Sequence, residues 1–317
     1  MSLAGEAGWA RLSPAQVSAG PPPTLVPATP IALFLREHEA AWRALRPGTE
    51  GPPPGVAEQL VWSVLRSRGA SFFRDLAAAC GLDADELRQR IGNLAAAGLV
   101  ASDGFAGLRA LVWAARGRLG HHDRRSQFAG RWTAIVPEVH DATRDEAVEQ
   151  QAWSLLRRYG VVFRRLLTRE TNAAAWRELA RVYRRLEARG EIRSGRFVTG
   201  MSGEQFALPF AAEQIREVRR LPTGHLVAVS GADPLNLAGI VTAGARVRAA
   251  SRTRIVHRDG VPIAVAERGV VRELAPLDPA TSAEAARLLK ARFVAWGTTG
   301  AERAPLAAAS VAAHPHP

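Results

Sequence analysis

A pattern of helices and turns occurs twice in the chain, about 91 residues apart, and this repeat constrains the fold more than any other feature. Residues 69–72 and Gly98 in the first copy align with residues 160–163 and Gly190 in the second. Each copy has the pattern of three helices followed by a short apolar segment punctuated by glycine, which is typical of a two-stranded wing. Repetition of one supersecondary unit indicates two copies of the same domain. The sequence therefore predicts tandem winged helices, which are relatives of the helix-turn-helix.

The third helix of the first copy is marked both at its start and along one face. Asp83, with Glu86 three residues later, has the spacing of a capping box. Leu87, Ile91 and Leu94 follow at intervals of four and three residues, which places them on one side of a helix. We therefore expect these three side chains in the core of the first winged helix.

The second copy carries the same signals. Thr143 and Glu146 form a second capping box at the start of its first helix. Its third helix is predicted over residues 173–189, with Trp176 on the inward face, and its wing over residues 192–208.

The pattern changes to short strands after the second copy. Asp259-Gly260 between two apolar segments is the strongest hairpin signal in the chain, and Arg268-Gly269 makes a second turn. Thr281, with Glu284 three residues later, is expected to cap a closing helix. The sequence therefore predicts a small antiparallel sheet or barrel followed by one helix.

Together these patterns predict an α+β fold, with tandem winged-helix domains followed by a small antiparallel β-module and a C-terminal helix. The expected divisions are a flexible N-terminal arm (1–30), a first winged-helix domain with a leading helix at 31–45 and a wing at 99–111 (31–112), an Arg-rich linker (113–142), a second winged-helix domain (143–210), a helix with the β-barrel-like module and closing helix (211–297), and a disordered tail (298–317).

The charge of the chain indicates a polyanionic partner, and its clustering is better evidence than its total. The net charge is +12 and the isoelectric point about 11.3. Lys290 is the one lysine, so nearly every cation is arginine, a bias that GC-rich coding also produces. Between residues 105 and 200, however, 19 arginines face 10 acidic residues. This concentration favours nucleic acid, DNA in duplex or single-stranded form, as the partner.

Arginines on the predicted third helices and on the second wing are the candidate DNA-binding residues. In the second copy the helical arginines lie opposite the apolar face, where a major groove or a phosphate backbone could be reached. The alternative is a solvated surface neutralised locally, with Glu178 and Glu187 as partners. The first copy is the weaker candidate because acidic residues offset its arginines. The candidates are Arg177, Arg181, Arg184, Arg185, Arg193 and Arg196 in the second copy, and Arg88 and Arg90 in the first.

Aromatic residues in the linker offer a second way to hold DNA. Trp132 and Phe128 lie near Arg124, Arg125 and Arg131, and bases stack on aromatic rings beside arginine in single-strand binding proteins. Burial in a core is the more ordinary role for such residues.

Several function classes lack their sequence signatures. Cys80 is the one cysteine, so no disulfide can form within the chain, and we expect neither a metal site nor a cofactor. No phosphate-binding loop or dinucleotide fingerprint is present, so we expect no ATPase activity from this chain alone. With no apolar run of membrane-spanning length and no signal peptide, we expect a cytoplasmic protein with no membrane partner. Asp233 and Glu204 remain candidate catalytic carboxylates for excising a flipped base, but the catalytic residues are not identified from sequence.

Seven strings in consistent order resemble the C-terminal region of the bacterial large helicase-related (Lhr) proteins, a family of superfamily 2 DNA helicases. The resemblance extends over residues 21–274. The strings are Thr24-Leu25-Val26-Pro27-Ala28-Thr29-Pro30-Ile31 with Leu35-Arg36-Glu37-His38, Gly69-Ala70-Ser71-Phe72-Phe73, Ser102-Asp103-Gly104-Phe105-Ala106-Gly107-Leu108-Arg109, Tyr159-Gly160-Val161-Val162-Phe163-Arg164, Arg185-Leu186-Glu187-Ala188-Arg189-Gly190-Glu191-Ile192, Ser202-Gly203-Glu204-Gln205-Phe206-Ala207-Leu208-Pro209 and Ala232-Asp233-Pro234-Leu235-Asn236-Leu237.

This resemblance implies a DNA-binding module of a repair helicase, built from winged helices and a barrel-like module. Because the motor motifs are absent, helicase activity would need a separate motor subunit. The family region is also similar in fold to winged-helix DNA glycosylases of the AlkZ type, which implies excision of uracil or damaged bases as an alternative. A winged-helix regulator that stands alone is the second alternative.

Overall fold

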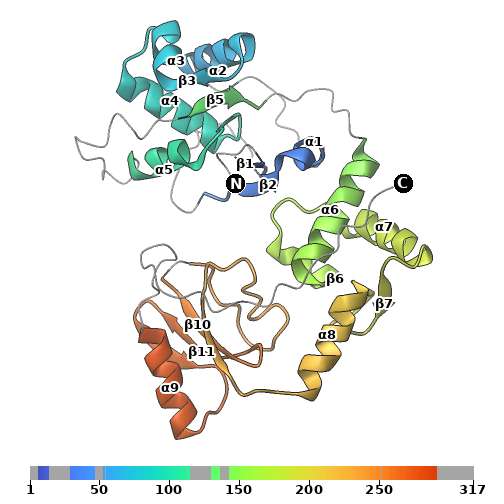
Figure 1. Ribbon diagram of the computed structural model, residues 1–317. Helices are drawn as coiled ribbons and strands as arrows, with labels where there is room; N and C mark the ends of the chain where they lie inside the picture. The colour runs from blue at the N-terminus through green and yellow to red at the C-terminus, as the bar shows by residue number, and fades with distance from the viewer. Residues whose placement is uncertain are drawn as a thin grey trace, which may run out of the picture. The chain divides into compact units, whose positions relative to one another are not determined.

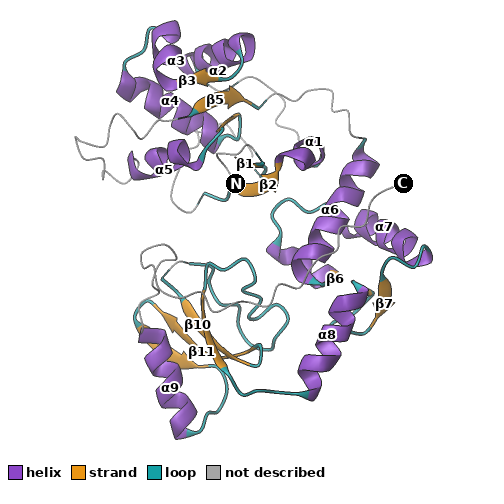
Figure 2. Ribbon diagram, viewed as in Figure 1, coloured by secondary structure: helices purple, strands orange, loops and turns teal. Residues whose placement is uncertain are grey.

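The computed structural model describes residues 6–13, 29–46, 53, 55–114, 130–135, 143–250 and 252–290. The chain divides into two compact units, Met1–Leu221 and Pro222–Pro317. Both units combine helices with small antiparallel sheets (Figures 1 and 2), so the α+β prediction is confirmed. Both winged helices lie in the first unit.

The first winged helix has three helices and a three-stranded sheet. Asp83 accepts hydrogen bonds from the backbone N–H groups of Asp85 and Glu86, both at 2.8 Å, which confirms the predicted start of the third helix. The helices are α2 (Val56–Arg68), α3 (Phe73–Cys80) and α4 (Ala84–Ala96), and the sheet order is β3 (Ser71–Phe72), β5 (Arg131–Ala134) and β4 (Val100–Ser102).

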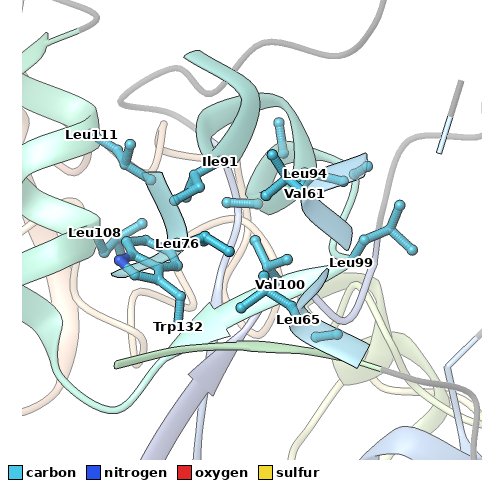
Figure 3. Packing of buried hydrophobic residues seen from close by; sticks show 14 of the residues in the cluster. Val61, Leu65, Leu76, Ile91, Leu94, Leu99, Val100, Leu108, Leu111 and Trp132 are labelled. Carbon is cyan, nitrogen blue, oxygen red and sulfur yellow. The ribbon is translucent and has the colours of Figure 1, made fainter. Parts of the chain in front are cut away.

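The core of this domain is a continuous set of buried side chains drawn from its helices and its sheet. Leu87, Ile91 and Leu94 are buried there, as their spacing predicts. Trp132 is also completely buried and packs in the same cluster (Figure 3), with Trp9 edge-on to it at 6.4 Å between ring centroids. The stacking hypothesis is therefore wrong for Trp132, because its ring fills the core. Phe128, Arg124 and Arg125 lie outside the described residues.

The predicted wing at residues 99–111 is wrong in its second half. Only β4 is a strand, and the chain continues as helix α5 (Phe105–Ala114). Leu108 and Leu111 are three residues apart and both buried, a helical spacing that glycines at 104 and 107 concealed. The strand that pairs with β4 is β5, from the segment expected to be linker.

The described part of the predicted N-terminal arm is folded. β1 (Ala7–Ala10) pairs antiparallel with β2 (Ala32–Leu35), where a helix over residues 31–45 was expected. The buried Phe34 lies between exposed Leu33 and Leu35, which is strand alternation. The helical part is limited to η1 (Arg36–His38) and α1 (Glu39–Ala44), and α1 packs against the second winged helix.

Two buried or half-buried arginines join this N-terminal segment to the first winged helix. Arg11 donates a hydrogen bond from Nη1 to the carbonyl of Ala96, and Arg46 donates from Nη2 to the carbonyl of Ala97 at 3.2 Å. Both acceptors are among the last carbonyls of α4, which have no partner within the helix. Burial lowers the pKa of both guanidiniums, and their role is structural.

The second winged helix follows the predicted order closely. Thr143 and Glu146 form the reciprocal capping box at the start of α6. The predicted wing is a hairpin, since β7 and β8 pair antiparallel. The elements are α6 (Arg144–Tyr159), β6 (Val161–Phe163), η2 (Arg164–Arg169), α7 (Trp176–Ala188), β7 (Arg193–Gly195), β8 (Gln205–Ala207) and α8 (Pro209–Arg220), with sheet order β6-β8-β7.

In the described residues of the second unit, four antiparallel strands form an open sheet and do not close into a barrel. Asp259, Gly260, Arg268 and Gly269 all have positive φ, which confirms the two predicted turns. Helix α9 (Pro279–Lys290) covers one face, and residues 231–250 contribute the buried side chains of the other. The strands are β9 (Leu226–Ser230), β10 (Arg254–Arg258), β11 (Val261–Glu267) and β12 (Val270–Glu273), in the order β12-β11-β10-β9.

The closing helix begins two residues before Thr281. Asp278 accepts hydrogen bonds from the backbone N–H and the hydroxyl of Thr281, at 3.0 and 2.6 Å, so the capping side chain is Asp278. The unit begins at Pro222, which leaves α8 with the first unit although a boundary near residue 211 was expected.

Candidate nucleic-acid interface

Helix α7 is strongly amphipathic, and aromatic packing fixes which side faces outward. Leu179, Tyr183 and Leu186 are buried, and the Tyr183 ring lies 5.1 Å from that of Phe206 on β8. The Tyr183 hydroxyl donates to the carbonyl of Ala152 on α6, and burial raises its pKa. Because this side is anchored to both α6 and the sheet, the opposite side of α7 is presented to solvent.

All six predicted arginines of the second copy are exposed, and two of them are paired. Arg184 makes a two-point contact with Glu204, with Nε and Nη2 at 2.8 and 2.6 Å from the carboxylate oxygens. Arg185 lies 2.7 Å from Glu149 on α6. Local neutralisation therefore applies to these two residues, but through Glu204 and Glu149 and not through the expected Glu178 and Glu187. The six exposed arginines are Arg177, Arg181, Arg184 and Arg185 on α7, Arg193 on β7 and Arg196 beyond it.

The other four, which we term the open arginines, are Arg177, Arg181, Arg193 and Arg196. Among the described residues, no carboxylate lies within ion-pair distance of any of them. The nearby Glu178 is paired with Arg144, whose Nε is 2.8 Å away, and this hydrogen bond lowers the pKa of the carboxyl. Two open arginines lie one turn apart on α7, and the other two lie on β7 and just beyond it.

Carboxylates fix the wing to α7. Glu187 on α7 accepts hydrogen bonds from both the backbone N–H and the hydroxyl of Ser194 on β7. Glu204, directly before β8, is the partner of Arg184, and that hydrogen bond lowers the pKa of Glu204. Glu204 is therefore a structural link, and this geometry does not support it as a catalytic acid.

A buried amide holds the loop of the wing, and sequence analysis missed it. The side chain of Gln205 is almost completely buried, and its oxygen accepts from the backbone N–H groups of Phe197 and Val198, at 2.9 and 2.8 Å. Its nitrogen donates to the carbonyl of Val198 at 2.9 Å. A loop held in this way keeps its shape without DNA, which reduces the entropy lost on binding. A lone glutamine beside an apolar strand gives no sequence signal for this role.

The candidate arginines of the first copy belong to a structural network. Arg88 is largely buried and contacts Asp85. Arg90 lies 3.1 Å from the buried Glu58 on α2, which also accepts a hydrogen bond from Asn93 at 2.9 Å. Burial alone would raise the pKa of Glu58, but these hydrogen bonds outweigh it, and the net pKa is lowered.

The second unit places the other candidate carboxylate in an ordered turn. Asp233 begins the turn Asp-Pro-Leu-Asn, in which the backbone N–H of Asn236 donates to the Asp233 carbonyl at 2.9 Å. The buried Asn236 amide holds the turn by donating to the Gly231 carbonyl at 2.8 Å. Burial lowers the pKa of His257, and the nearby Asp233 carboxylate opposes this shift. The Asp233 carboxylate is thus close enough to the His257 imidazole to affect its pKa.

Two negative observations apply to the part of the chain that the structure describes. It contains no group of three or more potential metal-ligating side chains. Every helix in that part is too short or too polar to cross a bilayer.

Comparison with known proteins identifies the second winged helix. Residues 141–226 match the family described as "Large helicase-related protein, winged-helix domain". The chain is 26% identical over 243 residues to "Lhr helicase/uracil glycosylase" of Escherichia coli (strain K12), covering 66% of this chain and 16% of that protein. It is 28% identical over 206 residues to "Lhr helicase/ probable uracil glycosylase" of Mycolicibacterium smegmatis, covering 56% of this chain and 14% of that protein. The chain thus spans about a sixth of the relatives' length, and the predicted resemblance to the Lhr family is confirmed.

Proposed function

From its relation to the large helicase-related proteins, we propose that this chain is a DNA-binding module of an Lhr-type repair helicase. In this proposal the second winged helix holds the DNA on which an ATPase motor, outside the 317 residues of this sequence, acts. The observation that supports it is the set of four open arginines, two on α7 and two on or just beyond β7. Exposed guanidiniums without acidic partners are available to phosphates, since no protein ion pair has to be broken first.

The packing of α7 gives the proposal a specific geometry. The N-terminal half of the helix carries Arg177 and Arg181, while the hairpin carries Arg193 and Arg196. In winged-helix and helix-turn-helix proteins, a helix of this kind enters the major groove and flanking elements contact the backbone. We expect Arg177 and Arg181 to contact one groove and its phosphates, and the wing to contact the neighbouring backbone.

A matched pair of double variants tests this proposal. Arg177→Ala with Arg181→Ala removes two open arginines of α7. Arg185→Ala with Arg189→Ala removes two arginines, near the end of α7 and directly after it, that are paired with Glu149 of α6. Binding to a 20-base-pair duplex is measured by fluorescence anisotropy across a range of salt concentrations. The slope of log affinity against log salt is negative, and the first variant is expected to reduce its magnitude by about 1.8, since each phosphate contact contributes about 0.9. Equal slopes in the two variants would exclude α7 as the phosphate-binding helix.

A second candidate function is base excision, and the Asp233–His257 neighbourhood favours it. The names of both relatives include uracil glycosylase. Hydrolysis of an N-glycosidic bond needs a carboxylate that orients water or stabilises positive charge on the sugar. Asp233 is partly buried in a turn fixed by Asn236, so it is held in a defined position.

The test is an abasic-site assay with uracil-containing DNA. The full chain is expected to produce abasic sites, and Asp233→Asn to lose at least 100-fold in rate while keeping duplex affinity. Glu204→Gln serves as the control because Glu204 is paired with Arg184, and it is expected to retain excision. An inactive wild-type chain, or an Asp233→Asn variant with full activity, would remove Asp233 from this role.

A further inference from the structure

Three arginines of the second unit are exposed on the segment that leads into β10. They are Arg246, Arg248 and Arg252, and we term them the loop arginines. Val247, between the first two, is buried in a core cluster with Ile255 of β10. Exposure therefore alternates along residues 246–248, as in an extended chain, and both arginines lie on the outer side.

The fold brings the backbone of the three loop arginines together at one glycine. A Cβ at Gly231 would lie 2.9 Å from the carbonyl oxygen of Arg248 and 2.6 Å from the Cβ of Thr253. The Gly231 N–H also donates to the Thr253 carbonyl at 2.7 Å. Since Arg252 directly precedes Thr253, the loop arginines are carried by one compact stretch of backbone.

Further contacts fix this stretch of backbone in the absence of any ligand. The Asn236 amide donates to the Val247 carbonyl at 3.4 Å, and the backbone N–H of Arg248 donates to the Glu267 carboxylate at 3.3 Å. Gly239 has a φ of +74°, and a Cβ there would lie 2.5 Å from the Cα of Arg246. The loop arginines therefore project from a backbone that is already ordered.

The charges of the loop arginines are not compensated within the described residues, where no carboxylate lies within ion-pair distance of any of them. Each carboxylate described in the second unit has another partner. The pairs are Glu267 with Arg272, Glu284 with Arg287, Asp259 with Thr223, Glu273 with Ser282, Asp278 with Thr281, and Asp233 with the backbone N–H of Leu235.

We propose that the loop arginines bind the phosphate backbone of DNA, as a contact in addition to that of α7. Guanidiniums recognise phosphates through charge-assisted hydrogen bonds, and here no protein ion pair has to be broken first. Because the loop is ordered, it loses little conformational entropy on binding. DNA as the source of the phosphates rests on the proposed DNA-binding function. Asn236 joins the loop to the turn that begins at Asp233, so a strand bound here lies beside that turn.

The experiment compares the full chain with two double variants that lose the same charge. Arg246→Ala with Arg248→Ala removes two loop arginines. Arg287→Ala with Lys290→Ala removes two exposed cations of α9, which covers the opposite face of the sheet. Affinity for a 40-base-pair duplex is measured across a range of salt concentrations. Hydrogen exchange of the backbone amides is followed with the duplex, with poly-L-glutamate as a polyanion without phosphates, and with neither.

The loop variant is expected to reduce the magnitude of the salt slope by about 1.8, and the affinity at about 0.1 M salt about tenfold, because two phosphate contacts are lost. The α9 variant is expected to match the wild type. In the wild type, the duplex is expected to slow exchange at residues 242–250, and the loop variant is expected to lose this protection.

An unchanged slope in the loop variant, an equal change in the α9 variant, or the absence of protection at residues 242–250 would each overturn the inference. Protection by poly-L-glutamate alone would identify an acidic protein segment as the ligand, and it would overturn the inference as well.

Exchange at residues 176–188 reports separately on α7. Protection there without protection of the loop removes only the site at the loop arginines and leaves the proposed function intact. The reverse result supports the loop arginines and removes α7 as the phosphate-binding helix. Failure of this site is therefore distinguishable from failure of the proposed function.

Discussion

Helices α4 and α7 occupy the same place in their two winged helices and share an inward face. Both are 13 residues long, and each is followed by a glycine of positive φ, Gly98 or Gly190. When their first residues are aligned, the buried positions coincide. The coincident pairs are Leu87 with Leu179, Ile91 with Tyr183, and Leu94 with Leu186.

The outward faces of these helices differ at every position proposed to contact DNA. None of the four arginines of α7 has an arginine at the aligned position of α4. The aligned pairs are Arg177 with Asp85, Arg181 with Gln89, Arg184 with Gly92, and Arg185 with Asn93. The two arginines of α4 fall instead at positions where α7 has the buried Ala180 and Val182.

This comparison indicates that the inward face of each helix is determined by packing in the fold, whereas the outward face is determined by the function of the domain. Packing requires apolar side chains at fixed spacing, so both copies keep them. Solvent-facing positions contribute little to stability, and they are therefore available for specialisation. In the first copy the arginines stabilise the domain, and in the second they are proposed to bind a polyanion.

The largest expected effect is on the free energy of unfolding, which should distinguish the structural arginine network of the first winged helix from the surface ion pairs of the second. Glu58→Ala removes the buried acceptor of Asn93 and Arg90, and it is expected to lower the free energy of unfolding by about 3 kcal/mol. Glu149→Ala removes the half-exposed partner of Arg185 and Arg189, and it is expected to cost less than about 1 kcal/mol. Urea unfolding followed by circular dichroism measures both. Similar losses would contradict the distinction between a structural and a surface network.

Glu58 is also expected to make the free energy of unfolding depend on pH. Because the pKa of Glu58 in the folded chain lies below its ordinary value of 4.5, its contribution is fully present above that pH. The contribution is lost as the pH falls through the lower, folded-state pKa. Glu58→Gln is therefore expected to show a flatter stability profile below pH 4.5 than the wild type. Parallel profiles would mean that Glu58 does not carry this dependence.

A smaller effect is expected from the amide that holds the wing. Gln205→Leu leaves the backbone N–H groups of Phe197 and Val198 without their acceptor, at a cost of about 2 kcal/mol in unfolding free energy. Duplex affinity is expected to fall about fivefold, since the loop has to be ordered on binding. The salt slope should not change because no phosphate contact is removed. A changed slope would show that the loop positions a phosphate contact directly.

The smallest effect compares aligned residues in the two copies. Arg181→Ala is expected to lower the salt slope of duplex binding by about 0.9, and Gln89→Ala to leave it unchanged. Neither change should alter stability by more than about 0.5 kcal/mol, because both side chains are exposed. Equal effects of the two substitutions on DNA binding would mean that the copies do not differ in function.

The sequence by itself determined the elements whose signals are local. Capping residues at Asp83 and Thr143, the turns at Asp259 and Arg268, and the spacing of apolar residues are set within a few positions of the chain. Backbone hydrogen bonding and side-chain periodicity act over the same short range. The second wing and the strands of the second unit were predictable for this reason.

Only the tertiary structure decided where the sheet of the first winged helix finds its strands. β5 pairs with β4 across about 30 residues, and Trp132 completes a core made mostly by the helices. Likewise, β1 lies in the predicted arm and pairs with β2, which lies in a segment predicted to be a helix. Such pairings depend on burial between distant residues, for which a local pattern carries no information.

Tertiary structure also decided which arginines remain available. Arg181 and Arg185 lie on the same helix and are equally exposed by pattern, yet Arg185 has a partner on α6 that is 36 residues away in sequence. Whether a guanidinium is neutralised depends on which carboxylate the fold brings within about 4 Å. The sequence determined that α7 has an arginine face, and the packing of α6 and the wing against it determined which of those charges are open.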